Sequence, residues 1–187
     1  MKNMQSLLDT IQTLMTMTSP LVAIDGPSGG GKSTLAQELL KKYPGTQIFH
    51  MDDFFLQPDM RTELRLGLPG GNVDHERFLS QVLQPLARDE EFIYYIYDCQ
   101  SDTFSAKKAG TAPLHIIEGS YSLHPKLRDF YDIKVFLDID EQFQANRIRK
   151  RNLEGAERFF EEWIPLENLY FSNCGVRECS DFLLEQL

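Results

Sequence analysis

The chain has 187 residues, 42% of them hydrophobic and 25% charged, as expected for one compact globular domain. Its formal net charge of −9 argues against a general nucleic-acid-binding protein, which should present a basic surface. The three cysteines follow neither a disulfide nor a zinc-binding spacing, and no apolar stretch approaches the roughly 20 residues of a membrane span, so we expect a cytoplasmic protein.

The first nineteen residues predict an amphipathic helix. They place one apolar stripe at helical spacing, made of Leu7, Leu8, Ile11, Leu14 and Met15. A targeting segment would instead carry a continuous apolar core, so we expect this helix to pack on the domain.

Glycines dominate the next segment, "IDGPSGGGKST" (24–34), which follows the short apolar run 20–25. Its pattern Gly26-x-x-x-x-Gly31-Lys32-Ser33 is the phosphate-binding P-loop, whose backbone N–H groups cradle phosphates ahead of a helix. In this pattern Lys32 reaches the outer phosphates and Ser33 ligates Mg²⁺. The segment predicts a nucleotide site formed by Gly26, Pro27, Ser28, Gly29, Gly30, Gly31, Lys32, Ser33 and Thr34.

The rest of the chain alternates predicted strands with predicted helices. Apolar runs indicate buried strands at 46–51, 92–97, 114–119 and 133–139. Helical patterns cover 75–89, where Pro85 favours a kink, and 140–152. This alternation predicts an α/β fold, a P-loop NTPase three-layer α/β/α sandwich around a mainly parallel five-stranded sheet. We expect a single domain over 1–187 with its core at 20–152.

Acidic residues follow three of these strands. Asp52 and Asp53 come after the second, Asp102 lies just beyond the third, and Glu118 ends the fourth. Ligands of parallel sheets bind at the carboxyl ends of strands, so we expect these acids at a site, although each alone suits a helix cap. In phosphoryl transfer, such acids hold Mg²⁺ or accept the proton of an attacking hydroxyl.

The segment "NRIRKR" gathers basic residues on the last predicted helix. Arg147 and Arg151 are four positions apart and so share a face. A solvated charge run is one interpretation. We favour a phosphate clamp on a closing lid, over about residues 141–165, because this acidic chain concentrates its cations beside a nucleotide site. The aromatic cluster around Trp163 suits either core or lid packing or a partner surface.

Several segments, in this order and spacing, resemble the uridine kinase and phosphoribulokinase group of P-loop kinases, and within it a short bacterial subgroup called uridine kinase-like. They are "GPSGGGKST", "MDDFF", "NVDHERF", "YD", "IIEG" and "FLDIDEQFQANRIRKR", over about residues 20 to 152. The resemblance implies a nucleoside-kinase-like fold, Asp52 as general base, Glu118 at Mg²⁺, and Arg147 and Arg151 as lid arginines acting with Lys32. It also implies that Asp74 contacts ribose hydroxyls and that Tyr97 lines the base pocket.

The sequence departs from this family where the acceptor binds. Asp53 stands at a family serine, Asp102 at a histidine that contacts the pyrimidine, and Phe104 at an arginine. We therefore expect Asp53 and Asp102 in an altered acceptor pocket, beside retained phosphoryl-transfer residues.

The leading hypothesis is a kinase that uses ATP and Mg²⁺ to phosphorylate a hydroxyl of a uridine-like nucleoside or similar metabolite. Two alternatives stay open: a kinase for a non-nucleoside alcohol such as pantothenate, and a regulatory P-loop NTPase that acts as a switch with a protein partner. The expected partner is a small-molecule acceptor rather than nucleic acid or membrane. ATP is favoured over GTP by the resemblance alone, and a homo-oligomer stays open.

Overall fold

The computed structural model describes residues 3–151 and 155–185. The strands are β1 (Leu21–Asp25), β2 (Gln47–His50), β3 (Phe92–Asp98), β4 (Thr103–Ala109), β5 (His115–Glu118), β6 (Ile133–Asp138) and β7 (Phe182–Glu185). The helices are α1 (Met4–Met15), α2 (Lys32–Lys42), α3 (Glu63–Leu66), α4 (His75–Phe78), α5 (Gln84–Ala87), α6 (Glu141–Arg151), α7 (Ala156–Arg158) and α8 (Ile164–Asn173). Short 3-10 turns occupy Met51–Phe54, Pro58–Met60 and Arg128–Phe130, and π-helical turns occupy Leu79–Leu83 and Phe159–Trp163.

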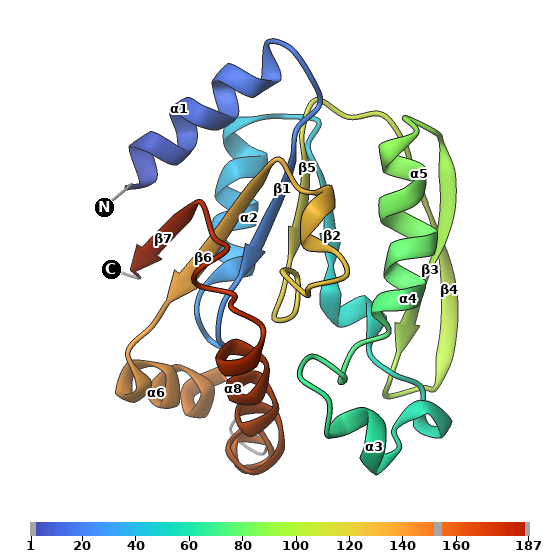
Figure 1. Cartoon of the computed structure of the whole chain (residues 1–187), viewed down its shortest axis with the longest axis vertical. Coiled ribbons are helices and arrows are strands. Elements are labelled where there is room, and N and C mark those ends of the chain that lie inside the picture. Colours follow the sequence, from blue (N-terminus) through green and yellow to red (C-terminus); the bar gives the residue numbers. More distant parts are fainter. Residues whose placement is uncertain (1–2, 152–154, 186–187) are drawn as a thin grey trace.

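A five-stranded parallel sheet forms the centre of the molecule, in the order β2-β5-β1-β6-β7 (Figure 1). Ile24 of β1 and His50 of β2 both lie in register with Glu118 of β5. The carboxyl ends of these three strands therefore meet at one edge, as parallel pairing requires. The predicted α/β fold with a five-stranded parallel sheet is confirmed.

One predicted strand lies elsewhere. The run 92–97 belongs to β3, which pairs antiparallel with β4 in a separate two-stranded sheet, and the fifth strand of the main sheet is β7. Ile93 and Tyr95 are exposed while Tyr94 is buried and Ile96 half-buried, an alternation typical of a strand covered mainly on one face. The apolar run was wrongly interpreted as a two-sided core strand because exposed aromatic residues look hydrophobic in sequence.

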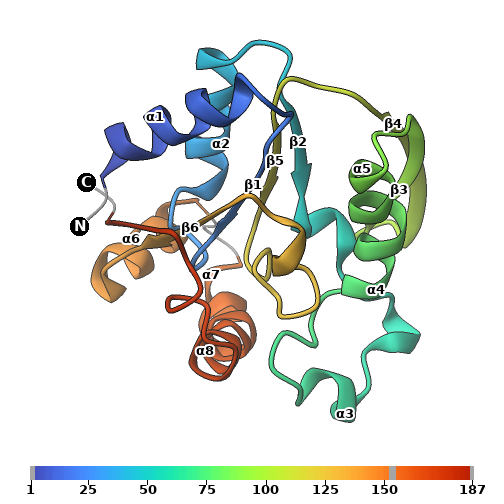
Figure 2. The same ribbon diagram turned by 45° about the horizontal axis from the view of Figure 1, so that its top comes forward.

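Both faces of the main sheet are covered. On one face, α1 and α2 contribute Leu7, Ile11, Leu35 and Leu39 to a core cluster with alternate strand residues such as Ile24. Phe54, Phe78, Tyr170 and other side chains cover the opposite face. Figure 2 shows α1 and α2 together on one side of the strands, away from α8 and α4. The two clusters account for the expected three layers, and α1 packs on the domain through Leu7 and Ile11 of the predicted apolar stripe.

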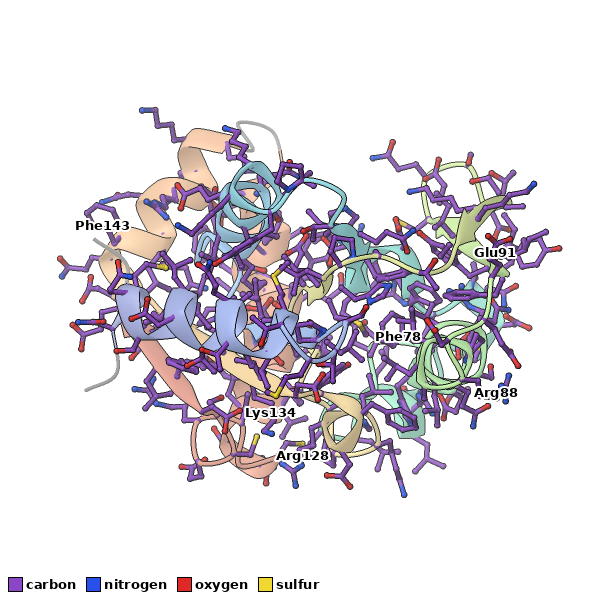
Figure 3. The ribbon with its side chains drawn as sticks, turned by 90° about the horizontal axis from the view of Figure 1, so that it is seen from above. Phe78, Arg88, Glu91, Arg128, Lys134 and Phe143 are labelled. Atoms are coloured by element: carbon purple, nitrogen blue, oxygen red, sulfur yellow. The ribbon has the colours of Figure 1, made fainter. Side chains whose placement is uncertain are left out.

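The predicted helix 75–89 exists as α4, a π-helical turn and α5 in unbroken succession. The π-helical turn directly precedes the segment with Pro85, whose missing N–H and bulky ring disturb regular α-helical bonding. This helix and the β3–β4 hairpin form one end of the molecule, where Figure 3 shows Arg88 and Glu91; Phe143 on α6 lies at the other end. Within the described residues, no helix has the length and apolar character needed to cross a membrane.

Candidate active site

A cleft of about 580 Å³ opens at the carboxyl ends of β1, β2 and β5. Segments far apart in sequence form its walls: the P-loop, the turn after β2, residues 118–121 at the end of β5, and residues of α6, of the π-helical turn Phe159–Trp163 and of α8. Its size and position match those of ligand sites in α/β proteins.

The P-loop follows β1 directly and forms the floor of this cleft. Gly26 has φ +145°, and a Cβ there would lie 2.3 Å from the carbonyl oxygen of Leu137. Gly31, with φ +89°, is the residue that precedes α2. Both positions require glycine, as the sequence predicted. Of the nine predicted nucleotide-binding residues, six line the cleft; Gly26, Pro27 and Gly30 shape the loop from behind.

Lys32 is the buried cation of the loop, with 8% of its surface exposed. Its Nζ donates hydrogen bonds to the carbonyl oxygens of Gly26, at 2.7 Å, and Pro27, at 2.9 Å. A third bond goes to Ser120 Oγ, at 3.2 Å. These bonds hold the ammonium group at the phosphate end of the cleft, where a P-loop lysine must act.

A carboxylate and a hydroxyl meet beside Lys32. Ser33 Oγ lies 3.1 Å and 3.2 Å from the two carboxylate oxygens of Glu118. Oxygen donors of this kind suit Mg²⁺, which is bound through one or two protein groups plus substrate phosphates. The donor set therefore fits Mg²⁺.

His50 is a member of this group that sequence analysis missed. Its Nδ1 lies 2.5 Å from Glu118 Oε1, and the bond to that carboxylate raises the pKa of His50. The available signal was its position at the end of the predicted strand 46–51, where functional side chains are expected.

Asp52 is the second residue of the turn after β2 and lines the cleft. Its side chain reaches solvent through the open mouth, yet protein atoms crowd the carboxyl group. This burial raises the pKa of Asp52, the nearby Lys32 opposes the shift, and Glu118 adds to it. A carboxylate with a raised pKa is a stronger base, which suits removal of a proton from a hydroxyl.

Cations of α6 form the facing wall. Arg147, Lys150 and Arg151 line the cleft, and Arg147 Nη1 donates to the carbonyl oxygen of Gly29 at 3.1 Å. Arg149 instead stacks over the Phe160 ring at 4.9 Å. The structure thus brings Arg147 to the P-loop and places Arg151 in the lining of the same cleft.

No protein-family profile matches the sequence. A uridine kinase of Streptococcus pneumoniae serotype 19F (strain G54) is 29% identical over 148 residues, which cover 74% of this chain and 69% of that protein. The same identity and coverage hold for the uridine kinase of Streptococcus pneumoniae strain JJA. Over these 148 residues the chain is therefore similar in sequence to uridine kinases.

Two solved structures share the fold. One is described as a possible uridine kinase from Bacillus stearothermophilus, with a TM-score of 0.69, 21% identity, and coverage of 95% of this chain and 98% of that one. The other is a candidate fructose transport system kinase from Silicibacter sp. TM1040, with a TM-score of 0.70, 23% identity and the same coverage.

The acceptor residues expected for a uridine kinase-like protein do not enter the cleft. The described residues that line the cleft do not include Asp53, Asp74, Tyr97 or Asp102. Asp74 caps α4 and pairs with Arg77 Nε at 3.1 Å. The Tyr97 hydroxyl donates to Asp102 at 2.8 Å, at the end of the β3–β4 hairpin, and Asp53 faces Lys107 at 3.7 Å.

Glu167 of α8 is the main cleft residue that the family motifs left unidentified. It is 4% exposed and accepts bonds from the backbone N–H of Ser28, at 2.9 Å, and from the hydroxyls of Ser28 and Ser120, both at 2.6 Å. It thereby ties α8 to the P-loop of this kinase fold. A glutamate within the mainly apolar segment "WIPLENLYF" was the local signal in the sequence. Asn72 and Tyr121 also line the cleft unforeseen.

Proposed function

We propose that the protein is a Mg²⁺- and ATP-dependent kinase that transfers the γ-phosphoryl group to a hydroxyl of a small polar metabolite. The single observation that carries this proposal is the convergence of Lys32, the Ser33–Glu118 pair, Asp52 and the α6 cations on one cleft. A base, a metal site and a phosphate cradle are the parts that phosphoryl transfer requires.

Each side chain has a definite task in this proposal. Asp52 accepts the proton of the acceptor hydroxyl as that oxygen attacks the γ-phosphorus, and the bond from phosphorus to the β–γ bridging oxygen breaks. Lys32 and the α6 arginines stabilise the negative charge that gathers on the phosphate oxygens. Ser33 and Glu118 would hold Mg²⁺, which supplies further charge neutralisation when bound.

Two classes of acceptor are considered. The uridine kinase relatives and the match of Asp74 and Tyr97 to family positions support a uridine-like nucleoside. The location of Asp53, Asp74, Tyr97 and Asp102 away from the cleft lining favours the second class, a non-nucleoside alcohol. A regulatory NTPase with a protein partner is the remaining alternative, and it would hydrolyse ATP with no added acceptor.

The Asp52→Asn variant tests the proposed base. We expect acceptor-dependent transfer to fall by about 100-fold or more, because general base catalysis contributes on that order. ATP binding, measured by calorimetry, should stay within about twofold, since the substitution removes no P-loop contact. The matched control is Asp59→Asn, an exposed aspartate in the following 3-10 turn, which should leave turnover unchanged.

Turnover of Asp52→Asn within about tenfold of the wild type, or roughly 1.4 kcal/mol in barrier, would show that Asp52 is not the base. A large increase in the Mg²⁺ concentration needed for activity would instead assign Asp52 to the metal.

A further inference from the structure

The turn after β5 holds a strained tyrosine. Tyr121 has φ +76°, a conformation that a bulky L-residue rarely adopts. The turn is fixed by bonds from the His124 N–H to the Tyr121 carbonyl oxygen, at 3.1 Å, and from the Leu123 N–H to Asp25 Oδ2, at 2.8 Å. Strain of this kind persists where the surroundings enforce it, and it concentrates at ligand-binding sites.

The side chain of Tyr121 is nearly buried yet lines the cleft, and only 3% of the residue is exposed. Its hydroxyl has no hydrogen-bond partner of good geometry within residues 3–151 and 155–185. Asn72, 6% exposed, lines the same wall, and its side chain lies close enough to the phenol to lower the pKa of Tyr121 against the larger effect of burial. A buried hydroxyl without a partner is costly unless a ligand completes it.

Aromatic rings contribute a different surface to this cleft. Phe55 and Trp163 both line it, and their rings stack with centroids 6.3 Å apart and planes inclined by 24°. The cleft therefore combines an apolar surface with the polar groups of Asp52, Asn72 and Tyr121. A sugar ring presents both matching features, apolar C–H faces and a rim of hydroxyls.

In the hairpin region, where the family resemblance places the nucleobase, Arg77 and Tyr97 already contact other protein groups. The Arg77 guanidinium stacks over the rings of Phe54, at 4.3 Å, and Phe104, at 5.3 Å. The Tyr97 hydroxyl is engaged by Asp102. An acceptor that binds in the cleft alone therefore does not need to carry a nucleobase.

We propose that the Tyr121 hydroxyl and the Asn72 amide bind a hydroxyl of the acceptor, and that this acceptor is a compact polyhydroxylated alcohol the size of a monosaccharide. This inference rests on the proposed function, because it places the acceptor beside Asp52 in the same cleft.

The test combines a panel of acceptors with the Tyr121→Phe substitution, which removes only the hydroxyl group. ADP release from Mg²⁺·ATP is measured with D-fructose, D-ribose and glycerol against uridine and cytidine, each beside a blank without acceptor. We expect a free sugar or polyol, and neither nucleoside, to stimulate turnover. With that acceptor, Tyr121→Phe should raise the acceptor KM about tenfold, the effect of one uncharged hydrogen bond, while the KM for ATP changes less than about twofold.

Tyr131→Phe is the matched control. Tyr131 is a second buried tyrosine whose hydroxyl lacks a partner among the described residues, but it does not line the cleft. The Tyr131→Phe variant should leave the KM for the acceptor and the KM for ATP unchanged. This result would separate acceptor binding from a general effect of removing a buried hydroxyl. Asn72→Asp, of nearly equal size, should also raise the acceptor KM and serves as the second variant.

Each other result overturns a defined claim. Stimulation by nucleosides alone would refute the acceptor class, and an unchanged acceptor KM in both Tyr121→Phe and Asn72→Asp would refute the subsite. Turnover that no alcohol stimulates, in a protein that binds ATP, would refute the proposed function and the inference with it.

Discussion

Three carboxylates lie almost fully buried around the P-loop: Asp25, Glu118 and Glu167. Each accepts hydrogen bonds that fix neighbouring segments, as buried charges must if they are to be tolerated. Asp25 ends β1 and receives the Gly26 N–H at 2.7 Å and the Leu123 N–H and Tyr170 hydroxyl, both at 2.8 Å. It therefore joins the P-loop, the turn after β5 and α8 from behind the cleft.

The titration of Asp25 gives a pH dependence of stability. Burial raises its pKa from the ordinary 3.8 to about 6 despite these bonds. Because the folded pKa is the higher one, the stabilisation is complete below pH 3.8 and is lost as the pH rises through about 6. The difference between the two pKa values of Asp25 corresponds to a change in the free energy of unfolding of about 3 kcal/mol at most. The free energy of unfolding of the wild type relative to Asp25→Asn should therefore decline between about pH 4 and 7.

Denaturant unfolding at several pH values measures that difference. Asp25→Asn should be less stable throughout, because an amide cannot accept all three bonds, so only the change of the difference with pH is diagnostic. Parallel pH profiles of the two proteins would contradict the assignment.

At the scale of elements, local patterns predicted the P-loop, α2, α6 and the strands β1, β2, β5 and β6. They failed where pairing partners decide the structure. The β3–β4 hairpin was missed because nothing in the run 92–97 identifies its antiparallel neighbour. β7 was missed because "FLLE" is a strand of four residues whose place beside β6 depends on distant contacts.

The residues of the candidate site also include some that local sequence patterns predicted and some that they missed. Lys32, Ser33 and Glu118 were predictable because they follow strands or stand in a fixed motif, and the structure brings them together. Glu167 was not, because its bond to Ser28 spans 139 residues. Tyr121 was also missed, since its positive φ depends on tertiary contacts that no local pattern reveals.

Arg77 links α4 to the β3–β4 hairpin. It pairs with Asp74 and donates to the carbonyl oxygens of Tyr95, at 2.5 Å, and Asp53, at 3.3 Å. Arg77→Ala should lower the free energy of unfolding by about 3 kcal/mol, because it leaves Asp74 buried without its charge partner. It should also speed hydrogen exchange of the β3 amides.

Arg88→Ala is the control for that measurement, since Arg88 is exposed at the outer side of the same unit and pairs only with Glu90 among the described residues (Figure 3). Arg88→Ala should change the free energy of unfolding by no more than about 0.5 kcal/mol. Equal hydrogen exchange in the wild type and Arg77→Ala would contradict the linking role of Arg77.

At the scale of the whole molecule, the cleft lies between the parallel sheet on one side and α6 to α8 on the other. Asp52, Ser33, Glu118 and the P-loop belong to the sheet side, whereas the α6 cations and Glu167 belong to the helical side. Movement of the helical side toward the sheet would enclose the phosphates and exclude water, as lids do in other kinases. Of the lid predicted over residues 141–165, residues 141–151 and 155–165 are described, and we propose them as the moving part; residues 152–154 lie outside the described residues.

The proposed function requires that the γ-phosphoryl group is transferred to an alcohol rather than to water. The most direct measurement is ADP release from Mg²⁺·ATP with each of a set of nucleosides, sugars, polyols and pantothenate, compared with a blank that contains no acceptor. We predict that at least one acceptor raises turnover far above the blank. High turnover of equal size in every reaction, the blank included, would contradict the claim and support an NTPase.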